Sequence, residues 1–195
     1  MGAECRTARA ARKRCGTIAA MEIRLRRARP GDVPALLALE AAGFRGDRIS
    51  PRQMRAHARG ATHARFVVAE RNGELLGNAL VLLRRGARRA RLYSIVVAAA
   101  ARGSGLGARL LERAEREARA GGASELSLEV GTRNRAAIAL YERHGYRRIG
   151  LARGYYEDGG DAWRYARPLG STGSHAPPGS RSDRYNRRNR PRSRP

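Results

Sequence analysis

A glycine-rich segment, Arg102-Gly103-Ser104-Gly105-Leu106-Gly107, is the part of this sequence best suited to bind a phosphate. It follows an apolar run, Leu92–Val97, and precedes a stretch with helical character from Ala108 to Ala120. A strand, a turn and a helix N-terminus in this order gather backbone N–H groups into a concave site with the helix dipole behind it. Its three glycines also lack the Cβ atoms that would keep a pyrophosphate away from the backbone.

Two well-known phosphate-binding loops can be compared with this segment. A Walker A loop requires lysine after its last glycine, whereas Gly107 is followed by Ala108, so this class is excluded. A dinucleotide-binding fingerprint fits loosely through Gly103, Gly105 and Ala108, with Glu125 as its acidic residue, and this alternative stays open. A glycine-rich turn without any ligand also stays open.

The residues beyond the loop predict a second strand and a second helix. Ser124–Val130 alternates strictly, with Leu126, Leu128 and Val130 on one face and Glu129 among the polar residues of the other. Asn134 is a typical N-cap for a helix over Arg135–His144, and Gly145 is a typical residue to end it.

These motifs together resemble one protein family. Residues Asn134–Tyr146 are similar to the signature Asn-x-x-Ala-x-x-Leu-Tyr-x-x-x-Gly-Phe/Tyr of the GNAT N-acetyltransferases, and Arg102, Gly105 and Gly107 match that family's Arg/Gln-x-x-Gly-x-Gly/Ala loop. With Leu128-Glu129-Val130 and Gly154-Tyr155-Tyr156, the chain resembles the RimI-like branch, the ribosomal-protein alanine acetyltransferases.

The resemblance is strongest from Leu92 to Tyr156, weaker from Met21 to Arg91, and reaches neither end of the chain. One departure is Val97-Ala98-Ala99, where the family usually has Val-Asp-Pro. We expect this change to alter the entry to the loop and to leave its phosphate chemistry intact.

The resemblance implies an α/β fold, a single mixed and mostly antiparallel sheet with helices on both faces. Strands at Ile95–Val97 and Glu125–Val130 would splay apart and leave a cleft. It also implies acetyl-coenzyme A as co-substrate. The implied contacts are the thioester-orienting Ile95, Val96 and Val97, the pyrophosphate-binding Arg102, Gly103, Ser104, Gly105, Leu106, Gly107 and Ala108, and Asn134.

The amine that accepts the acetyl group must be a free base. At pH 7 an α-amino group needs roughly 1 kcal/mol to lose its proton, and a lysine needs roughly 4–5 kcal/mol. Glu129, on the polar face of its strand, is the candidate base, and Tyr141 is the candidate acid for the leaving thiolate. Their spacing resembles that of the base and acid in RimI-like enzymes. The alternatives are a salt-bridged glutamate and a tyrosine packed in the core.

Tyr155 and Tyr156 are expected to line the acceptor side, because the branch with this pair uses it there; edge packing is the alternative. No metal site is expected. The four histidines lack metal-ligand spacing, and both cysteines, Cys5 and Cys15, precede Met21.

The net charge of +24 is spread along the whole chain and is almost entirely arginine, since Lys13 is the only lysine. Residues 1–20 carry +4, residues 171–195 carry +6, and the middle carries +14. A basic surface would speed the capture of coenzyme A, a polyanion. A weak contact with ribosome or RNA is the alternative interpretation.

Three regions follow from this composition. Residues 1–20 form a basic extension, with Met21 as a candidate native start, residues 21–170 form the acetyltransferase domain, and residues 171–195 form a disordered arginine-rich tail. The sequence contains no run of 18 apolar residues, so it predicts no membrane-spanning helix. A cytoplasmic protein is expected.

Further strands are predicted from alternation and turn signals, and Asn72-Gly73 should join two of them as a hairpin. Their ranges are Glu22–Ala28, Arg65–Glu70, Leu75–Leu83, Ala90–Val97, Tyr146–Arg153 and Ala162–Leu169. Asp32 should cap one helix, and Ser50-Pro51 should open another.

The sequence therefore predicts an N-acetyltransferase that moves an acetyl group directly to a primary amine, with a protein N-terminus of the ribosomal-protein type as first choice. A small-molecule amine is the second choice of acceptor. An arginine-rich RNA- or ribosome-binding module with an inactive acetyltransferase core is the rival from another class.

Overall fold

The computed structural model describes residues 22–43 and 49–170. The basic extension 1–20, the candidate start Met21 and the tail 171–195 lie outside the described residues, so these predictions stay predictions.

The described residues form one open, seven-stranded sheet in the order β1-β2-β3-β4-β5-β7-β6. Every neighbouring pair is antiparallel except β4 and β5. No strand end differs from its predicted position by more than two residues. The strands are β1 (Arg24–Arg27), β2 (Ala64–Arg71), β3 (Glu74–Leu82), β4 (Arg89–Val97), β5 (Glu125–Gly131), β6 (Arg147–Ala152) and β7 (Ala162–Pro168).

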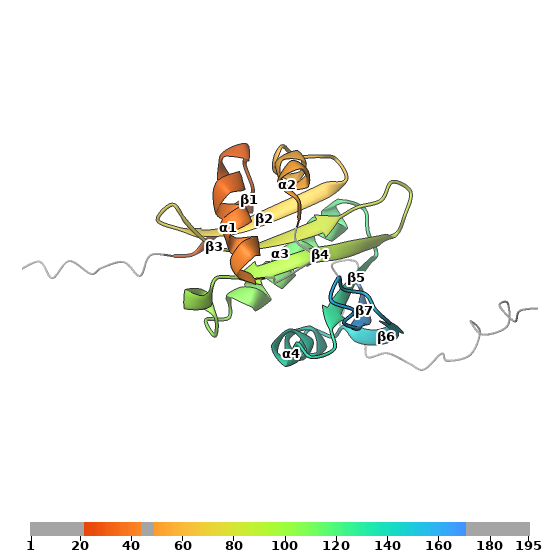
Figure 1. Ribbon diagram of the computed structural model, residues 1–195. Coiled ribbons are helices and arrows are strands. Elements are labelled where there is room, and N and C mark those ends of the chain that lie inside the picture. Colours follow the sequence, from red (N-terminus) through yellow and green to blue (C-terminus); the bar gives the residue numbers. More distant parts are fainter. Residues whose placement is uncertain (1–21, 44–48, 171–195) are drawn as a thin grey trace, which may run out of the picture.

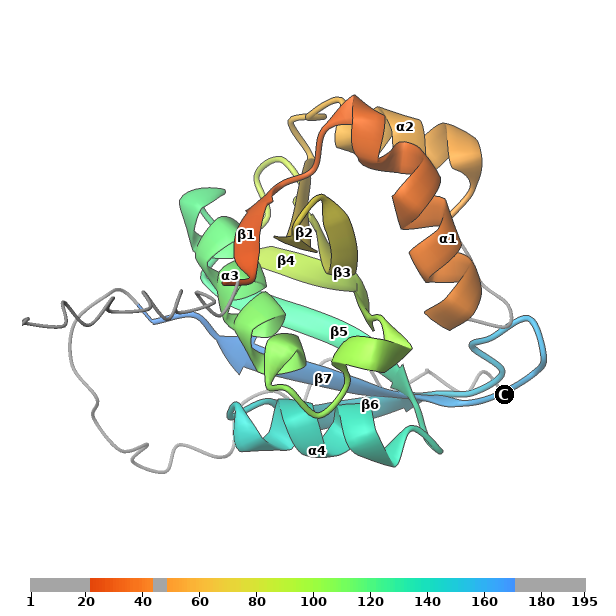
Figure 2. The ribbon, with the colours of Figure 1, turned by 90° about the vertical axis from the view of Figure 1, so that its left-hand side faces the viewer.

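Helices cover both faces of this sheet, which confirms the predicted fold class. The helices α1 and α2 lie over one face, and α3 and α4 lie over the other (Figures 1 and 2). Their bounds are α1 (Val33–Gly43), α2 (Pro51–Ala58), α3 (Leu106–Ala120) and α4 (Arg135–Arg143), with short 3-10 helices η1 (Pro30–Asp32) and η2 (Ala99–Ala101).

Local chemistry explains several of these boundaries. Ser50 accepts a hydrogen bond from the amide of Gln53 and opens α2, as predicted. Asn72 and Gly73 both have positive φ, 54° and 80°, which is the backbone that a two-residue hairpin requires.

The predicted cap at Asp32 is wrong. Its carboxylate accepts from the amide of Arg29 and from the guanidinium of Arg26, so it closes η1 and pairs with β1 instead of capping α1. Residue Pro34 offers no N–H, which removes one of the two amides that such a cap could bind.

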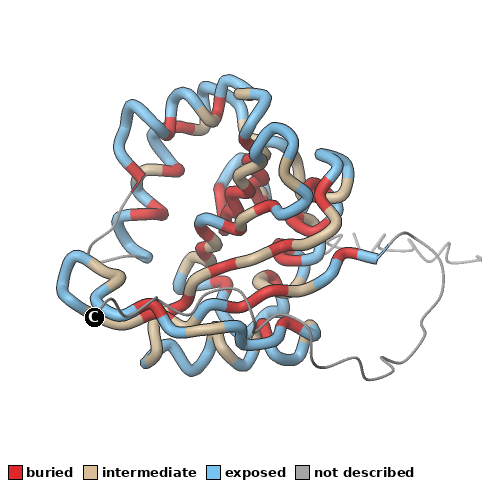
Figure 3. Tube along the Cα trace, turned by 90° about the vertical axis from the view of Figure 1, so that its right-hand side faces the viewer, coloured by how far each residue is buried: buried red, intermediate tan, exposed pale blue. Residues whose placement is uncertain are grey.

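The core has two layers, one on each side of the sheet. Buried positions follow the central strands and the sides of the helices that face them (Figure 3). Leu110 and Leu111 of α3 pack with Leu126 and Leu128 of β5 on one side, and Leu36 and Met54 lie in the cluster on the other. Each fully buried leucine of this kind contributes about 1.5–3 kcal/mol of transfer free energy.

The parallel pair β4 and β5 separates part-way along its length. Paired residues run from Arg89 opposite Glu125 to Leu92 opposite Leu128, and the pairing ends there. Beyond this point β4 continues to pair with β3, and β5 continues to pair with β7. The predicted splay is therefore confirmed, and it opens the edge of β4 from Tyr93 to Val97.

Two buried glutamates in the C-terminal half of α3 anchor this helix to the sheet. Glu115 accepts hydrogen bonds from the hydroxyl of Tyr146, at 3.2 Å, and from Nη1 of Arg167, at 2.7 Å. Glu117 accepts from Nη2 of Arg27 at 2.6 Å. These contacts join α3 to β1 and β7 and hold the C-terminal half of the helix against the sheet.

Candidate active site

The loop between η2 and α3 presents a cluster of free amides. Gly103 and Gly105 adopt φ of +78° and +79°, in the left-handed region that favours glycine. Within the described residues, the amides of Gly103 to Ala108 donate to no backbone carbonyl, and the first bond of this stretch runs from Arg109 N to Gly105 O. A Cβ built on Gly103 or Gly105 would meet nothing within 4 Å, so the space before them is open. Open space, unpaired amides and the start of a 15-residue helix fit a diphosphate.

A cavity of about 510 Å³, here called the loop cavity, lies beside these amides. It extends from the glycine loop along the unpaired edge of β4 to α4. Its lining residues are Gly43, Ile95, Val96, Val97, Ala101, Arg102, Gly103, Gly105, Leu106, Gly107, Asn134, Ala136, Ala137, Leu140 and Tyr141.

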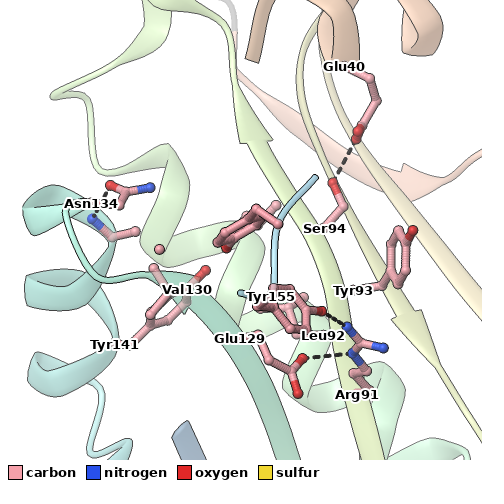
Figure 4. Close-up of a pocket in the computed structure, with 14 residues that line it drawn as sticks. Glu40, Arg91, Leu92, Tyr93, Ser94, Glu129, Val130, Asn134, Tyr141 and Tyr155 are labelled. Atoms are coloured by element: carbon pink, nitrogen blue, oxygen red, sulfur yellow. Dashed lines mark hydrogen bonds and ion pairs between the residues drawn. The ribbon is translucent and has the colours of Figure 1, made fainter. Parts of the chain in front are cut away.

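A second cavity of about 420 Å³, here called the tyrosine cavity, adjoins the loop cavity and shares lining residues with it. Figure 4 shows the residues that line the tyrosine cavity. Its lining residues are Glu40, Arg91, Leu92, Tyr93, Ser94, Ile95, Glu129, Val130, Gly131, Asn134, Ala137, Tyr141, Tyr155 and Tyr156. Four residues line both cavities: Ile95, Asn134, Ala137 and Tyr141.

Tyr141 stands at this junction. It projects from α4, is 4% exposed, and lies beside the ring of Tyr146, with the ring centroids 5.8 Å apart. Burial, reinforced by nearby Tyr156, raises the pKa of Tyr141 above the ordinary tyrosine value. The hydroxyl therefore keeps its proton at neutral pH and can donate a hydrogen bond to a group in either cavity.

Glu129 lies in the tyrosine cavity and takes part in an ion pair. Nε of Arg91 donates to Oε2 of Glu129 at 2.8 Å, and Nη2 of Arg91 donates to the hydroxyl of Tyr155 (Figure 4). The structure thus shows the salt bridge that was the alternative interpretation of Glu129, together with the cavity position that a base requires.

Glu40 is a second carboxylate in the wall of the same cavity. It belongs to α1, is 2% exposed, and accepts a hydrogen bond of 2.6 Å from the hydroxyl of Ser94 on β4. Burial raises the pKa of Glu40 above the ordinary glutamate value, and the hydrogen bond from Ser94 opposes this effect.

The tyrosine pair predicted to line the acceptor side lies in the wall of the tyrosine cavity. Tyr155 and Tyr156 line the tyrosine cavity and meet edge to face, with centroids 5.0 Å apart. The ring of Tyr156 approaches Gly131, since a Cβ there would lie 3.5 Å from it. Burial raises the pKa of Tyr155, while Arg91 opposes this shift and Glu129 adds to it.

Most residues predicted from sequence meet in the two cavities, with two exceptions. Ser104 and Ala108 are not among the residues lining the loop cavity, and the hydroxyl of Ser104 donates to the carbonyl of Ala101. Asn134 lines both cavities and its side chain accepts from the amide of Ala137, so the predicted cap is confirmed.

Sequence reasoning missed Glu40, Arg91, Tyr93 and Ser94. A lone carboxylate within the apolar stretch Ala35–Ala42 was a usable signal for Glu40, because such a residue rarely faces a core without a partner. Arg91 offered no comparable signal in a chain so rich in arginine. Among the described residues, no group of three or more His, Cys, Asp or Glu side chains could hold a metal ion.

Residues 34–146, more than half of the chain, match the acetyltransferase (GNAT) family. The chain belongs to this family. This chain is 37% identical over 135 residues to the N-alpha-acetyltransferase RimI of Mycobacterium tuberculosis. The match covers 68% of this chain and 84% of that relative. It is 40% identical over 82 residues to an IAA acetyltransferase of Azospirillum brasilense, covering 42% of this chain and 54% of that relative.

This chain also resembles solved structures. The crystal structure of the ribosomal-protein-S18-alanine N-acetyltransferase from Escherichia coli matches it with a TM-score of 0.68 and 28% identity, over 80% of this chain and 99% of that one. The chain spans about half the length of two of the curated relatives that it matches. None of the helices in the described ranges is both long and apolar enough to cross a membrane.

Proposed function

We propose that this protein is an acetyl-coenzyme A-dependent N-acetyltransferase that acetylates the α-amine of a protein N-terminus by direct transfer. One observation carries the proposal: a buried tyrosine, Tyr141, lines both the cavity beside the unpaired loop amides and the cavity that holds the carboxylates. Such a junction brings a thioester and an amine within reach of one proton donor.

Acetyl-coenzyme A, the co-substrate of enzymes of this family, supplies the activated acetyl group when bound. The amides of Gly103 to Ala108 would hold its pyrophosphate, as the unpaired donors and the open space before them favour. The unpaired edge of β4 from Ile95 to Val97 would orient the thioester and polarise its carbonyl through backbone hydrogen bonds.

Glu129 would accept the proton of the incoming ammonium, and Tyr141 would stabilise the departing thiolate by donating its proton or a strong hydrogen bond. An α-amine suits this arrangement, because it needs only roughly 1 kcal/mol to lose its proton at pH 7. The names of two relatives, an N-alpha-acetyltransferase RimI and a ribosomal-protein-S18-alanine acetyltransferase, support the same class of acceptor.

The test is steady-state acetylation of amidated peptides with free N-termini, measured for wild type, Glu129→Gln and a matched control, Glu125→Gln. Glu125 lies on the same strand, pairs with Arg89 and lies outside the tyrosine cavity. We expect kcat to fall at least ~10²-fold in Glu129→Gln, and to stay near the wild-type value in Glu125→Gln. Equal activities of the two variants would refute the role of Glu129.

The acceptor is tested in parallel with N-terminally blocked lysine peptides and with a panel of small amines. Turnover confined to the small amines would reject the protein N-terminus as acceptor. Binding of RNA that falls steeply with salt, with no acetylation of any amine, would instead favour the binding-module alternative.

A further inference from the structure

The tyrosine cavity contains one cation. Among the described residues that line it, Arg91 carries the only positive charge, beside the two carboxylates Glu40 and Glu129. The side chain of Arg91 is 39% exposed, and its guanidinium carbon lies 5.3 Å from the ring centroid of Tyr93. A cavity that only had to accept an ammonium group would not need this cation.

The hydrogen bonds of Arg91 leave part of its guanidinium available. Nε donates to Glu129 and Nη2 donates to Tyr155, whereas Nη1 has no hydrogen-bond partner among the described residues. The edge formed by Nη1 and Nη2 can still present two parallel N–H groups, which is the geometry that a carboxylate binds best.

The position of Arg91 differs from that of its neighbour Arg89. Arg89 lies opposite Glu125 in the strand register and pairs with it directly. Arg91 lies opposite Ser127, but its guanidinium reaches along the cavity wall to Glu129, at the point where the two strands separate. Arg91 thereby contacts the residue that we propose as the base.

We propose that Arg91 binds a carboxylate that the acceptor carries close to its reacting amine. This inference rests on the proposed function and names the acceptor more closely. The acceptor's carboxylate would take the Nη1–Nη2 edge while Nε keeps its 2.8 Å contact with Oε2 of Glu129, so Arg91 would hold the acceptor beside the proposed base. An acidic side chain near a protein N-terminus and the α-carboxylate of a free amino acid both have this chemistry.

The experiment measures kcat/KM for two matched pairs of acceptors at one low salt concentration. The first pair is an amidated peptide beginning Ala-Glu and the same peptide beginning Ala-Gln. The second pair is free alanine and alaninamide. We expect the acid to be preferred by at least ~10-fold in one of the pairs, from the strength of charge-assisted hydrogen bonds. The pair that shows the preference identifies the source of the carboxylate.

Three variants decide whether Arg91 causes the preference. Arg91→Gln should reduce the ratio of the two kcat/KM values to near one, and Arg91→Lys should keep part of it because the charge remains. Arg89→Gln removes the same charge from the same strand outside the tyrosine cavity, so the ratio should stay at the wild-type value.

Using a ratio cancels any effect of the substitutions on Glu129 that all acceptors share. Turnover by wild type without preference in either pair would overturn the inference while leaving the acetyltransferase proposal intact. An equal loss of preference in Arg89→Gln and Arg91→Gln would overturn it too, because the general surface charge would then be the cause. No turnover of any acceptor would reject both proposals.

Discussion

Replacing Gly105 with alanine separates the stability of the glycine loop from its affinity for coenzyme A. Gly105 has φ of +79°, and a Cβ built on it meets nothing within 4 Å. The folded protein therefore suffers no clash, and the cost is the strain of a left-handed alanine, about 1–2 kcal/mol. For a domain of this size that strain should lower Tm by ~2–8 °C.

Gly60 provides a matched control. It has φ of +83°, its Cβ also meets nothing within 4 Å, and it follows α2, away from the residues that line the loop cavity. Gly60→Ala should therefore lose a similar amount of stability.

Only Gly105→Ala should lose affinity for coenzyme A, because the added Cβ enters the space that the pyrophosphate needs in order to reach the free amides. Losing one charge-assisted hydrogen bond costs about 1.5–3 kcal/mol, which weakens binding by ~10–150-fold. Isothermal titration calorimetry with coenzyme A, at one low salt concentration, measures this difference. If Gly105→Ala binds coenzyme A as tightly as Gly60→Ala does, the loop does not hold the phosphates, and our account of the loop cavity is wrong.

Four further substitutions test other parts of the structure. Asn134→Ala and Ser50→Ala each remove a helix cap and should each cost ~1 kcal/mol in chemical denaturation, but only Asn134→Ala should also weaken coenzyme A binding. The raised pKa of Glu40 means that the folded state keeps a proton which the unfolded chain releases, so wild-type stability falls as pH rises above the ordinary glutamate value. Glu40→Gln should lack this fall, so its stability relative to wild type should increase as pH rises above the ordinary glutamate value. A difference in stability that does not change with pH would contradict this. The hydrogen bond from Arg26 lowers the pKa of Asp32, so its contribution is present at neutral pH and lost in acid. Asp32→Asn should therefore cost ~1–3 kcal/mol at pH 7 and progressively less as pH falls below the ordinary aspartate value, measured by urea denaturation across pH.

The sequence predicted best those features that depend on neighbouring residues. The glycine-rich turn before α3, the cap at Asn134 and the Asn72-Gly73 hairpin each follow from the chemistry of a few adjacent positions. The α3 helix begins at Leu106 and not at Ala108, because the glycine-containing end of the loop already adopts helical backbone.

The contacts that complete the site were not predictable in this way. Arg91 and Glu129 are 38 residues apart, and Glu40 and Ser94 are 54 residues apart. Each pair meets only because of the order of strands in the sheet and the packing of α1 over it. The resemblance supplied Glu129 and Tyr141 as candidates, but only the folded chain shows that Arg91 holds one of them.

The two cavities differ in what they are made of, and this difference has an evolutionary consequence. The phosphate recognition that we propose at Gly103 to Ala108 would use the main chain, which most substitutions leave unchanged. The walls around Arg91 and Tyr155 are side chains that a single codon can replace. Proteins with this architecture can therefore change which amine they accept without losing the main-chain site that would bind the acetyl donor. Substrate choice should therefore drift faster than donor choice among proteins of this architecture.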